Sequence, residues 1–162
     1  MFGSLRRYRQ DLEFYKESPF IKLSSNYKEY EYVIFGLVIT SGDADNGGDK
    51  YADPMIWTGF PYWNMEELDD KTHFDYYVNT IESLNMIDNL VDVKYGDQLL
   101  TLSTCYSDED NSRFLIVARQ LRDGETEASL KKLITGGVAE TDTEESDTDS
   151  KTDTEEETSS EE

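Results

Sequence analysis

Residues 99–119 decide the fold, because the sequence reads LLTLSTC at 99–105, YSDEDNS at 106–112 and RFLIVAR at 113–119. The first and last of these segments are apolar and rich in strand-forming residues, and a polar segment separates them. This pattern predicts two β-strands joined by a loop. The first strand ends at Cys105 and the second begins at Arg113, so we expect a thiol and a guanidinium at one edge of a sheet.

These two residue types together have a chemical meaning. A cysteine acts as a nucleophile only as the thiolate, which a nearby cation favours. The fixed N–H donors of a guanidinium can also hold a developing oxyanion. Both roles suit acyl transfer. The chain has a single cysteine, so no internal disulfide forms, and the competing interpretation of Cys105 is a small buried hydrophobe.

The segments before this region predict a sheet with helices around it. Apolar residues at steps of three and four predict a helix from Phe2 to Tyr15, which Ser18-Pro19 ends. Residues 20–23 and 30–40 predict a hairpin with a largely buried second strand. Asp69 or Asp70 begins a second amphipathic helix that runs to Leu84.

The remaining segments predict shorter elements. Residues 91–93 and 99–102 flank the turn residues Gly96-Asp97 and predict a further hairpin. Residues 130–137 predict a short final helix or strand. The fold class is therefore mainly β, a barrel-like sheet with peripheral helices.

Three further features have mainly structural interpretations. The aromatic residues Trp57, Phe60, Tyr62 and Trp63 favour core or edge packing over the wall of a substrate groove. Residues 41–53 contain acidic residues and glycines, but Pro54 stands where a calcium loop needs a glutamate, so we expect a solvated loop. His73, the only histidine, lies in the first turn of the second helix and is expected to be structural.

Charge divides the chain into two parts. The net charge is −21, and residues 140–162 hold twelve acidic residues, one basic residue and no aromatic or large aliphatic residue. We expect residues 1–139 to form one domain and residues 140–162 to be a disordered acidic tail. The acidic charge disfavours binding to nucleic acid and to anionic lipid surfaces.

The motif around the cysteine resembles that of the class B sortases. LTLSTC at residues 100–105, followed by Arg113 at the start of an apolar strand, is similar to the sortase signature TLSTC and its arginine. YVIF at residues 32–35 resembles the Y-x-V-F strand of the class, and residues 74–84 resemble the helix inserted before its last strands. The resemblance covers residues 1 to about 121.

The resemblance implies a β-barrel cysteine transpeptidase of a Gram-positive cell surface that uses no cofactor or metal. Such an enzyme cleaves the sorting-signal peptide of a surface protein after a threonine, through a thioester on cysteine, and an amine of a cell-wall precursor resolves the thioester. Carried onto this sequence, Cys105 is the nucleophile and Arg113 stabilises the oxyanion or positions the peptide. Ser103 and Thr104 are candidates for substrate contact.

The sequence also departs from the family. Its catalytic histidine belongs to a G-H-N type motif that precedes a segment resembling residues 1–5, and its first barrel strands and membrane anchor also lie upstream. The sequence has no match to these parts, so we expect this polypeptide to have little or no activity. Two alternatives remain: a non-catalytic β-rich interaction module with an acidic binding tail, and an unrelated cysteine hydrolase.

Overall fold

The computed structural model describes residues 3–43, 56, 59–63, 68–107 and 110–136. Four antiparallel strands form one sheet in the spatial order β1-β2-β4-β3. The elements along the chain are η1 (Gly3–Leu5), α1 (Arg6–Gln10), α2 (Phe14–Glu17), β1 (Phe20–Ser24), β2 (Glu29–Ser41), α3 (Lys71–Leu84), β3 (Leu99–Cys105), β4 (Ser112–Gln120) and α4 (Glu127–Ile134).

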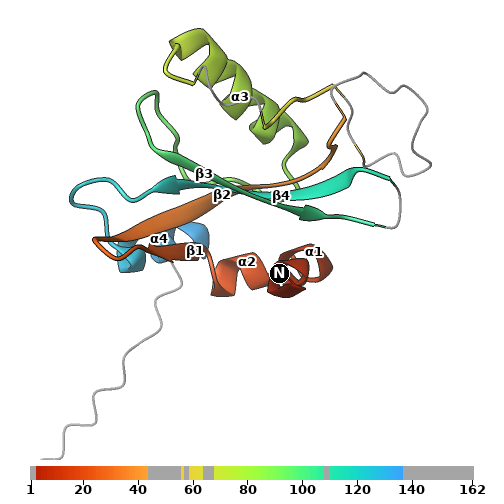
Figure 1. Ribbon diagram of the computed structural model, residues 1–162. Helices are drawn as coiled ribbons and strands as arrows, with labels where there is room; N and C mark the ends of the chain where they lie inside the picture. The colour runs from red at the N-terminus through yellow and green to blue at the C-terminus, as the bar shows by residue number, and fades with distance from the viewer. Residues whose placement is uncertain (1–2, 44–55, 57–58, 64–67, 108–109, 137–162) are drawn as a thin grey trace, which may run out of the picture.

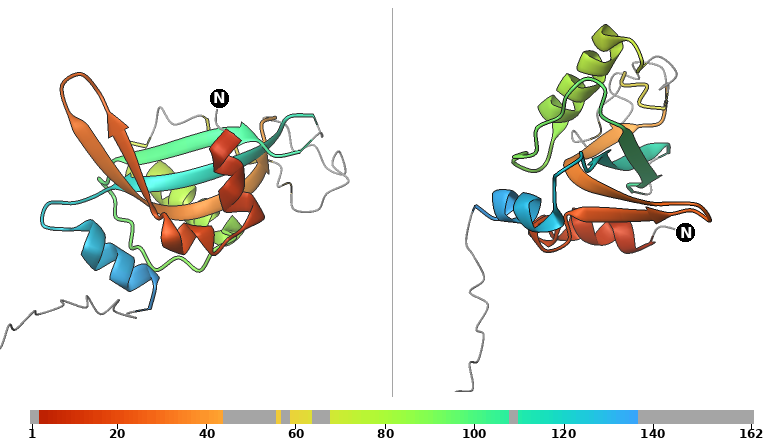
Figure 2. Two further views of the ribbon diagram at one scale, coloured as in Figure 1. Left: turned by 90° about the horizontal axis from the view of Figure 1, so that it is seen from below. Right: turned by 90° about the vertical axis from the view of Figure 1, so that its left-hand side faces the viewer.

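The sheet lies between two sets of helices. α3 covers one face, and α1, α2 and α4 lie on the other (Figure 1). The views from below and from the side show that the sheet is curled (Figure 2). The prediction of a mainly β protein with peripheral helices is therefore confirmed. Within the described ranges, no helix has the length and apolar character needed to cross a membrane.

The first hairpin is as the sequence predicts. β1 pairs with β2 in a register that places Phe20 opposite Val33, and the turn between them closes where Ser25 N–H donates to the Lys28 carbonyl at 2.9 Å. From Tyr32 to Ser41 every residue of β2 is buried. This strand is therefore the centre of the core.

A bulge in β2 brings α3 close to the sheet. The register between β2 and β4 shifts between Ile34 and Gly36. Asn85 bridges the bulge, since its Nδ2 donates to the Phe35 carbonyl at 2.8 Å and its Oδ1 accepts from Leu37 N–H at 2.9 Å. A Cβ at Gly36 would lie 2.5 Å from Cγ2 of Ile81, so the missing side chain permits the close approach of the helix.

The prediction of one continuous N-terminal helix is wrong, because the structure has three short helices there, η1, α1 and α2. Asp11 has extended backbone angles, and its carboxylate accepts the N–H of Glu13 at 3.0 Å. Aspartate competes with a helical backbone in this way by bonding to nearby N–H groups. The break lets both Tyr8 and Tyr15 be buried, with their hydroxyls donating to the carbonyls of Ser18 (2.6 Å) and Ile34 (3.2 Å).

The second helix is confirmed. α3 begins after Asp70, whose carboxylate accepts the N–H groups of Thr72 and His73, and it ends at Leu84. Its apolar face is buried at four positions: Phe74, Tyr77, Val78 and Ile81.

The hairpin predicted over residues 91–102 is only half present. β3 forms and the chain turns at Lys94–Asp97, but residues 91–93 are not a strand. Two arginines hold this segment instead. The backbone carbonyl of Asp92 accepts a hydrogen bond from Arg119 at 2.8 Å and another from Arg122 at 3.1 Å. Such contacts take the place of pairing with a neighbouring strand.

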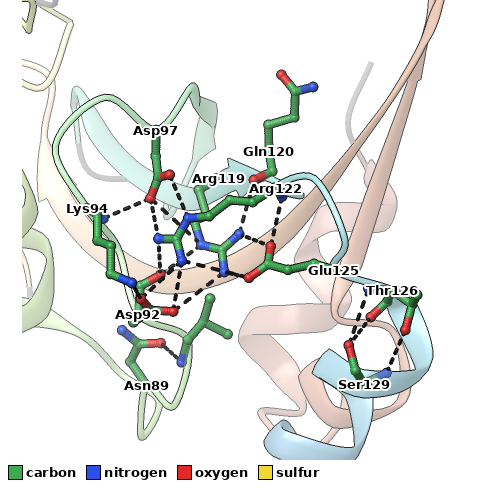
Figure 3. Close-up of polar contacts among 11 residues, drawn as sticks. Asn89, Asp92, Lys94, Asp97, Arg119, Gln120, Arg122, Glu125, Thr126 and Ser129 are labelled. Carbon is green, nitrogen blue, oxygen red and sulfur yellow. Dashed lines mark hydrogen bonds and ion pairs between the residues drawn. The ribbon is translucent and has the colours of Figure 1, made fainter.

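Arg119 and Arg122 form an ion cluster with three carboxylates (Figure 3). The Arg119 guanidinium is completely buried and meets Glu125 in a fork, at 2.7 and 2.8 Å. Arg122 meets both carboxylate oxygens of Asp97 at 2.8 and 2.7 Å and those of Asp92 at 3.2 and 3.1 Å. The cluster joins the end of β4 to the segment before β3 and to the segment before α4.

The last element is a helix, α4, capped by Thr126, whose hydroxyl accepts the N–H of Ser129 at 3.2 Å. It begins three residues before the predicted position. The predicted acidic tail at residues 140–162 lies outside the described residues, as does most of the loop considered for calcium.

Candidate active site

The structure places Cys105 directly opposite Arg113 across the β3–β4 pair. The next pair along, Tyr106 and Ser112, is hydrogen-bonded through Tyr106 N–H at 3.1 Å from the Ser112 carbonyl. Hydrogen-bonded and non-bonded pairs alternate in an antiparallel ladder, so Cys105 and Arg113 form a non-bonded pair, in which side chains lie closest. Their Cβ atoms are therefore expected to be about 4.5–5.5 Å apart on one face of the sheet.

Cys105 is the last residue of β3 and is exposed. It is not the core residue that the competing interpretation supposed. β3 is an edge strand of the sheet over the described residues, so a ligand can approach Cys105 from the side that β4 does not cover.

Arg113 is half-buried and is held by the start of its own strand. Its Nη2 donates to Oδ1 of Asn111 at 2.6 Å, and its Nη1 donates to the Ser112 carbonyl at 3.0 Å. Its Nε lies 3.3 Å from the position that a Cβ on Gly42 would occupy. The side chain therefore reaches toward the end of β2, and its guanidinium lies at the same end of the sheet as the thiol.

Ser103 and Thr104 lie on opposite faces of β3, because side chains alternate along a strand. Ser103 shares the face of Cys105, and its hydroxyl is 2.9 Å from that of Tyr62. Two residues earlier on this face, the Thr101 hydroxyl is 2.7 Å from that of Tyr77, whose pKa burial raises to about 12. A row of hydroxyl pairs thus leads along the sheet to the cysteine, while Thr104 faces the side of the N-terminal helices.

The aromatic residues of segment 57–63 that the structure describes include both buried and exposed side chains. Phe60 and Tyr62 are buried, with ring centroids 6.5 Å apart, and Phe60 also packs on Tyr77 at 5.4 Å. Trp63 is 44% exposed and meets Tyr62 edge to face at 5.1 Å. Packing is therefore their main role where they are described, and Trp57 lies outside the described residues.

Arg9 also contacts this region, and the sequence did not indicate this contact. This residue of α1 donates from Nη1 to the carbonyl of Tyr106, and its guanidinium lies 5.1 Å from the centroid of the Tyr106 ring. It ties the N-terminal helix to the residue that follows Cys105. No local signal could have found it, because the two residues are 97 positions apart.

His73 lies far from the thiol. α3 begins beside the turn that precedes β3, because Phe74 meets Tyr95 edge to face at 5.6 Å and the Tyr95 hydroxyl donates to the Asp69 carbonyl. Cys105 is at the other end of β3, six residues beyond Leu99, or about 20 Å at the rise of a strand. The imidazole Nδ1 is 3.8 Å from the carboxylate of Asp70, and the side chain is 52% exposed. The structure therefore brings Cys105 and Arg113 together without this histidine.

No group of three or more histidine, cysteine, aspartate or glutamate side chains in the described part of the chain is placed to hold a metal ion.

No family model matches the sequence, and no curated protein matches it closely enough to be counted as a relative. Solved structures do match the fold. Sortase B from Listeria monocytogenes is 25% identical with a TM-score of 0.53, and the match covers 75% of this chain and 56% of that one. Sortase B from Staphylococcus aureus is 21% identical with a TM-score of 0.55, covering 75% and 50% of the two chains.

Sortase B from Clostridium perfringens is 20% identical, with a TM-score of 0.52 and coverage of 75% and 58%. This chain thus spans between 50% and 58% of these three proteins. The resemblance to class B sortases stated from the sequence is confirmed in the fold, which extends over three quarters of the chain.

Proposed function

We propose, on the premise of this class B sortase fold, that the chain carries the nucleophile and the arginine of a cysteine transpeptidase. The observation that supports this most is the direct pairing of Cys105 with Arg113 across two adjacent strands. A thiol at an exposed strand end, with a guanidinium at the same end of the sheet, suits acyl transfer through a thioester.

The proposed reaction has two stages. The Cys105 thiolate attacks the carbonyl of a threonine in a sorting-signal peptide, and the peptide bond after that threonine breaks to leave a thioester and a free amine. An amine of a cell-wall precursor then attacks the thioester and restores the thiolate. Arg113 holds the oxyanion or the peptide, and of the two candidates for substrate contact, Ser103 and Thr104, only Ser103 lies on the face of Cys105. The substrate face is that of Cys105 and Ser103, which favours Ser103 for direct contact.

The substrate class is inferred from the neighbours. Sortase B of Staphylococcus aureus is known in a complex with its substrate, and a sortase B is known in a complex with Gly3. A peptide donor and an amine acceptor at the surface of a Gram-positive bacterium are accordingly the partners that we propose for this chain.

We also propose that this polypeptide has low activity on peptide bonds. The leaving amine of a peptide needs a proton, and general acid and base catalysis is worth roughly 100 to 10,000-fold. His73, the only histidine, lies near the opposite end of β3 from Cys105. We therefore expect acylation of Cys105 to be limited by departure of the amine.

An electrophilic peptide tests the nucleophile without needing that proton. A peptide ending in a threonyl chloromethyl ketone should alkylate Cys105 through displacement of chloride, and intact mass measurement should show a single adduct that Cys105→Ala abolishes. A matched peptide ending in a glutamyl chloromethyl ketone serves as the control. Equal labelling by both peptides, at the rate of a small free thiol, would contradict a threonine-selective site.

A further inference from the structure

Asn111 has a backbone conformation that sets it apart. Among the described residues it is the only non-glycine residue with a positive φ, at 59°. Asparagine adopts this left-handed region more readily than most residues. Its carbonyl accepts the N–H of Gly42 at 2.7 Å, so the turn before β4 is fastened to the end of β2.

The Asn111 side chain uses both ends of its amide. Oδ1 accepts from Nη2 of Arg113 at 2.6 Å, and Nδ2 donates to Oδ1 of Asp43. An aspartate at this position could not donate, and a serine or alanine could not reach both groups. The carboxamide therefore links the residue after β2 to the arginine of β4.

Gly42 leaves room for this arrangement. A Cβ there would lie 3.3 Å from each of three atoms, namely Arg113 Nε, the Asn111 carbonyl oxygen and Asn111 Oδ1. The arginine side chain thus packs against bare backbone. Its guanidinium is fixed at two points, by Asn111 Oδ1 and by the Ser112 carbonyl.

We infer that Asn111 is a positioning residue that holds the Arg113 guanidinium at the end of the sheet where β3 ends in Cys105. The inference rests on the proposed function of Cys105 and Arg113. An arginine side chain in water samples many rotamers, whereas a guanidinium held by two acceptors is fixed before the substrate arrives. Fixed charges cost no reorganisation when an oxyanion forms, so positioning of this kind supports the chemistry.

The charge near Cys105 can be measured with two alkylating reagents. Iodoacetate is an anion and iodoacetamide is neutral, so the ratio of their rates reports the local field, and the single cysteine makes the reaction specific. A unit charge about 6 Å away in water changes the rate for an anion by about threefold at low salt. We therefore expect Arg113→Gln to lower the ratio by about threefold.

The variant Asn111→Gly tests the positioning itself. Glycine keeps the left-handed backbone and removes only the amide. We expect the ratio to fall by about twofold or more, because the released guanidinium moves into water. Lys131→Gln removes one exposed charge from α4 and is the matched control, which should leave the ratio unchanged.

The outcomes separate the inference from the proposed function. An unchanged ratio for Asn111→Gly, with a lowered ratio for Arg113→Gln, would overturn the role of Asn111 and leave the cysteine–arginine pair in place. An unchanged ratio for both would overturn the pair as well. As a second measurement, the Nη–H signals of Arg113 in nitrogen-15 spectra should be separate in the unmodified chain and merge with those of solvent-exposed arginines in Asn111→Gly. Signals that stay separate would also contradict the inference.

Discussion

The ion pair between Arg119 and Glu125 offers a test of what holds the fold together. We consider the substitution Glu125→Gln, which keeps the shape of the side chain and removes its charge. The Arg119 guanidinium is completely buried, and both of its terminal nitrogens donate to Glu125. A glutamine offers one acceptor oxygen where the glutamate offers two, so one nitrogen loses its partner and the buried charge loses its nearest counter-ion.

The magnitude follows from the geometry of the cluster. Removing one partner of a buried ion pair costs about 3–5 kcal/mol. Two features reduce this cost: the Glu125 side chain is 21% exposed, and the carboxylates of Asp92 and Asp97 remain 3.8 and 3.9 Å from Arg119. We expect the free energy of unfolding to fall by about 2 kcal/mol. For a chain of this size the thermal midpoint should fall by about 4–8 °C.

Urea unfolding followed by circular dichroism measures this difference, with an unchanged slope against urea as the sign of an unchanged native state. Glu13→Gln is the matched control, because Glu13 meets Lys16 at 2.8 Å with its side chain 75% exposed. An exposed pair of this kind is worth about 0–1 kcal/mol. Equal losses for the two variants would refute the claim that the buried pair organises this end of the sheet.

Three further predictions concern stability. Asn85→Ala removes both hydrogen bonds that bridge the bulge in β2 and should lower the free energy of unfolding by about 2–4 kcal/mol, measured by urea unfolding. Gly36→Ala places a methyl group against Ile81 and should cost about 1–3 kcal/mol, while an unchanged midpoint would mean that α3 does not approach β2 so closely. Burial alone would raise the pKa of Asp97, but hydrogen bonds and charge from Arg122 outweigh it and the net shift is downward. Because the pKa of Asp97 is lower in the folded state, its carboxylate contributes its full stability above the unfolded pKa of about 4 and loses this contribution as the pH falls further. The thermal midpoint should therefore decrease as the pH is lowered below about 4. A midpoint that does not change with pH in this range would contradict the ion cluster.

The sequence predicted those elements whose signals are local. Aromatic and β-branched residues located the hairpin of β1 and β2, and acidic residues before an amphipathic pattern located the start of α3 within two residues. The strand that ends at Cys105 and the one that opens near Arg113 were also evident. Their opposition across the ladder then follows from a tight connection between antiparallel strands.

The parts that were missed depend on contacts between distant residues. The pattern of residues 91–93 suits a strand, yet Arg119 and Arg122 bind this segment from 27 to 30 positions away, and pairing with β3 does not form. The break at Asp11 permits the burial of Tyr8 and Tyr15, and their hydrogen bonds to the carbonyls of Ser18 and Ile34 reach beyond the two helices. The contact of Asn111 with Asp43, 68 positions away, depends likewise on how the ends of β2 and β4 meet.

Cys105 is proposed to be an acyl-accepting nucleophile that lacks only a proton donor for the leaving group. A threonyl peptide presented as a phenyl ester meets that need, because phenolate departs without protonation, whereas the same peptide as an amide does not. We expect the ester to acylate Cys105 faster than it acylates glutathione at equal thiol concentration. We also expect the amide to give no adduct, and hydroxylamine and Cys105→Ala each to remove the mass increase. Acylation by the ester no faster than that of glutathione, or acylation that persists in Cys105→Ala, would contradict the proposed role of Cys105.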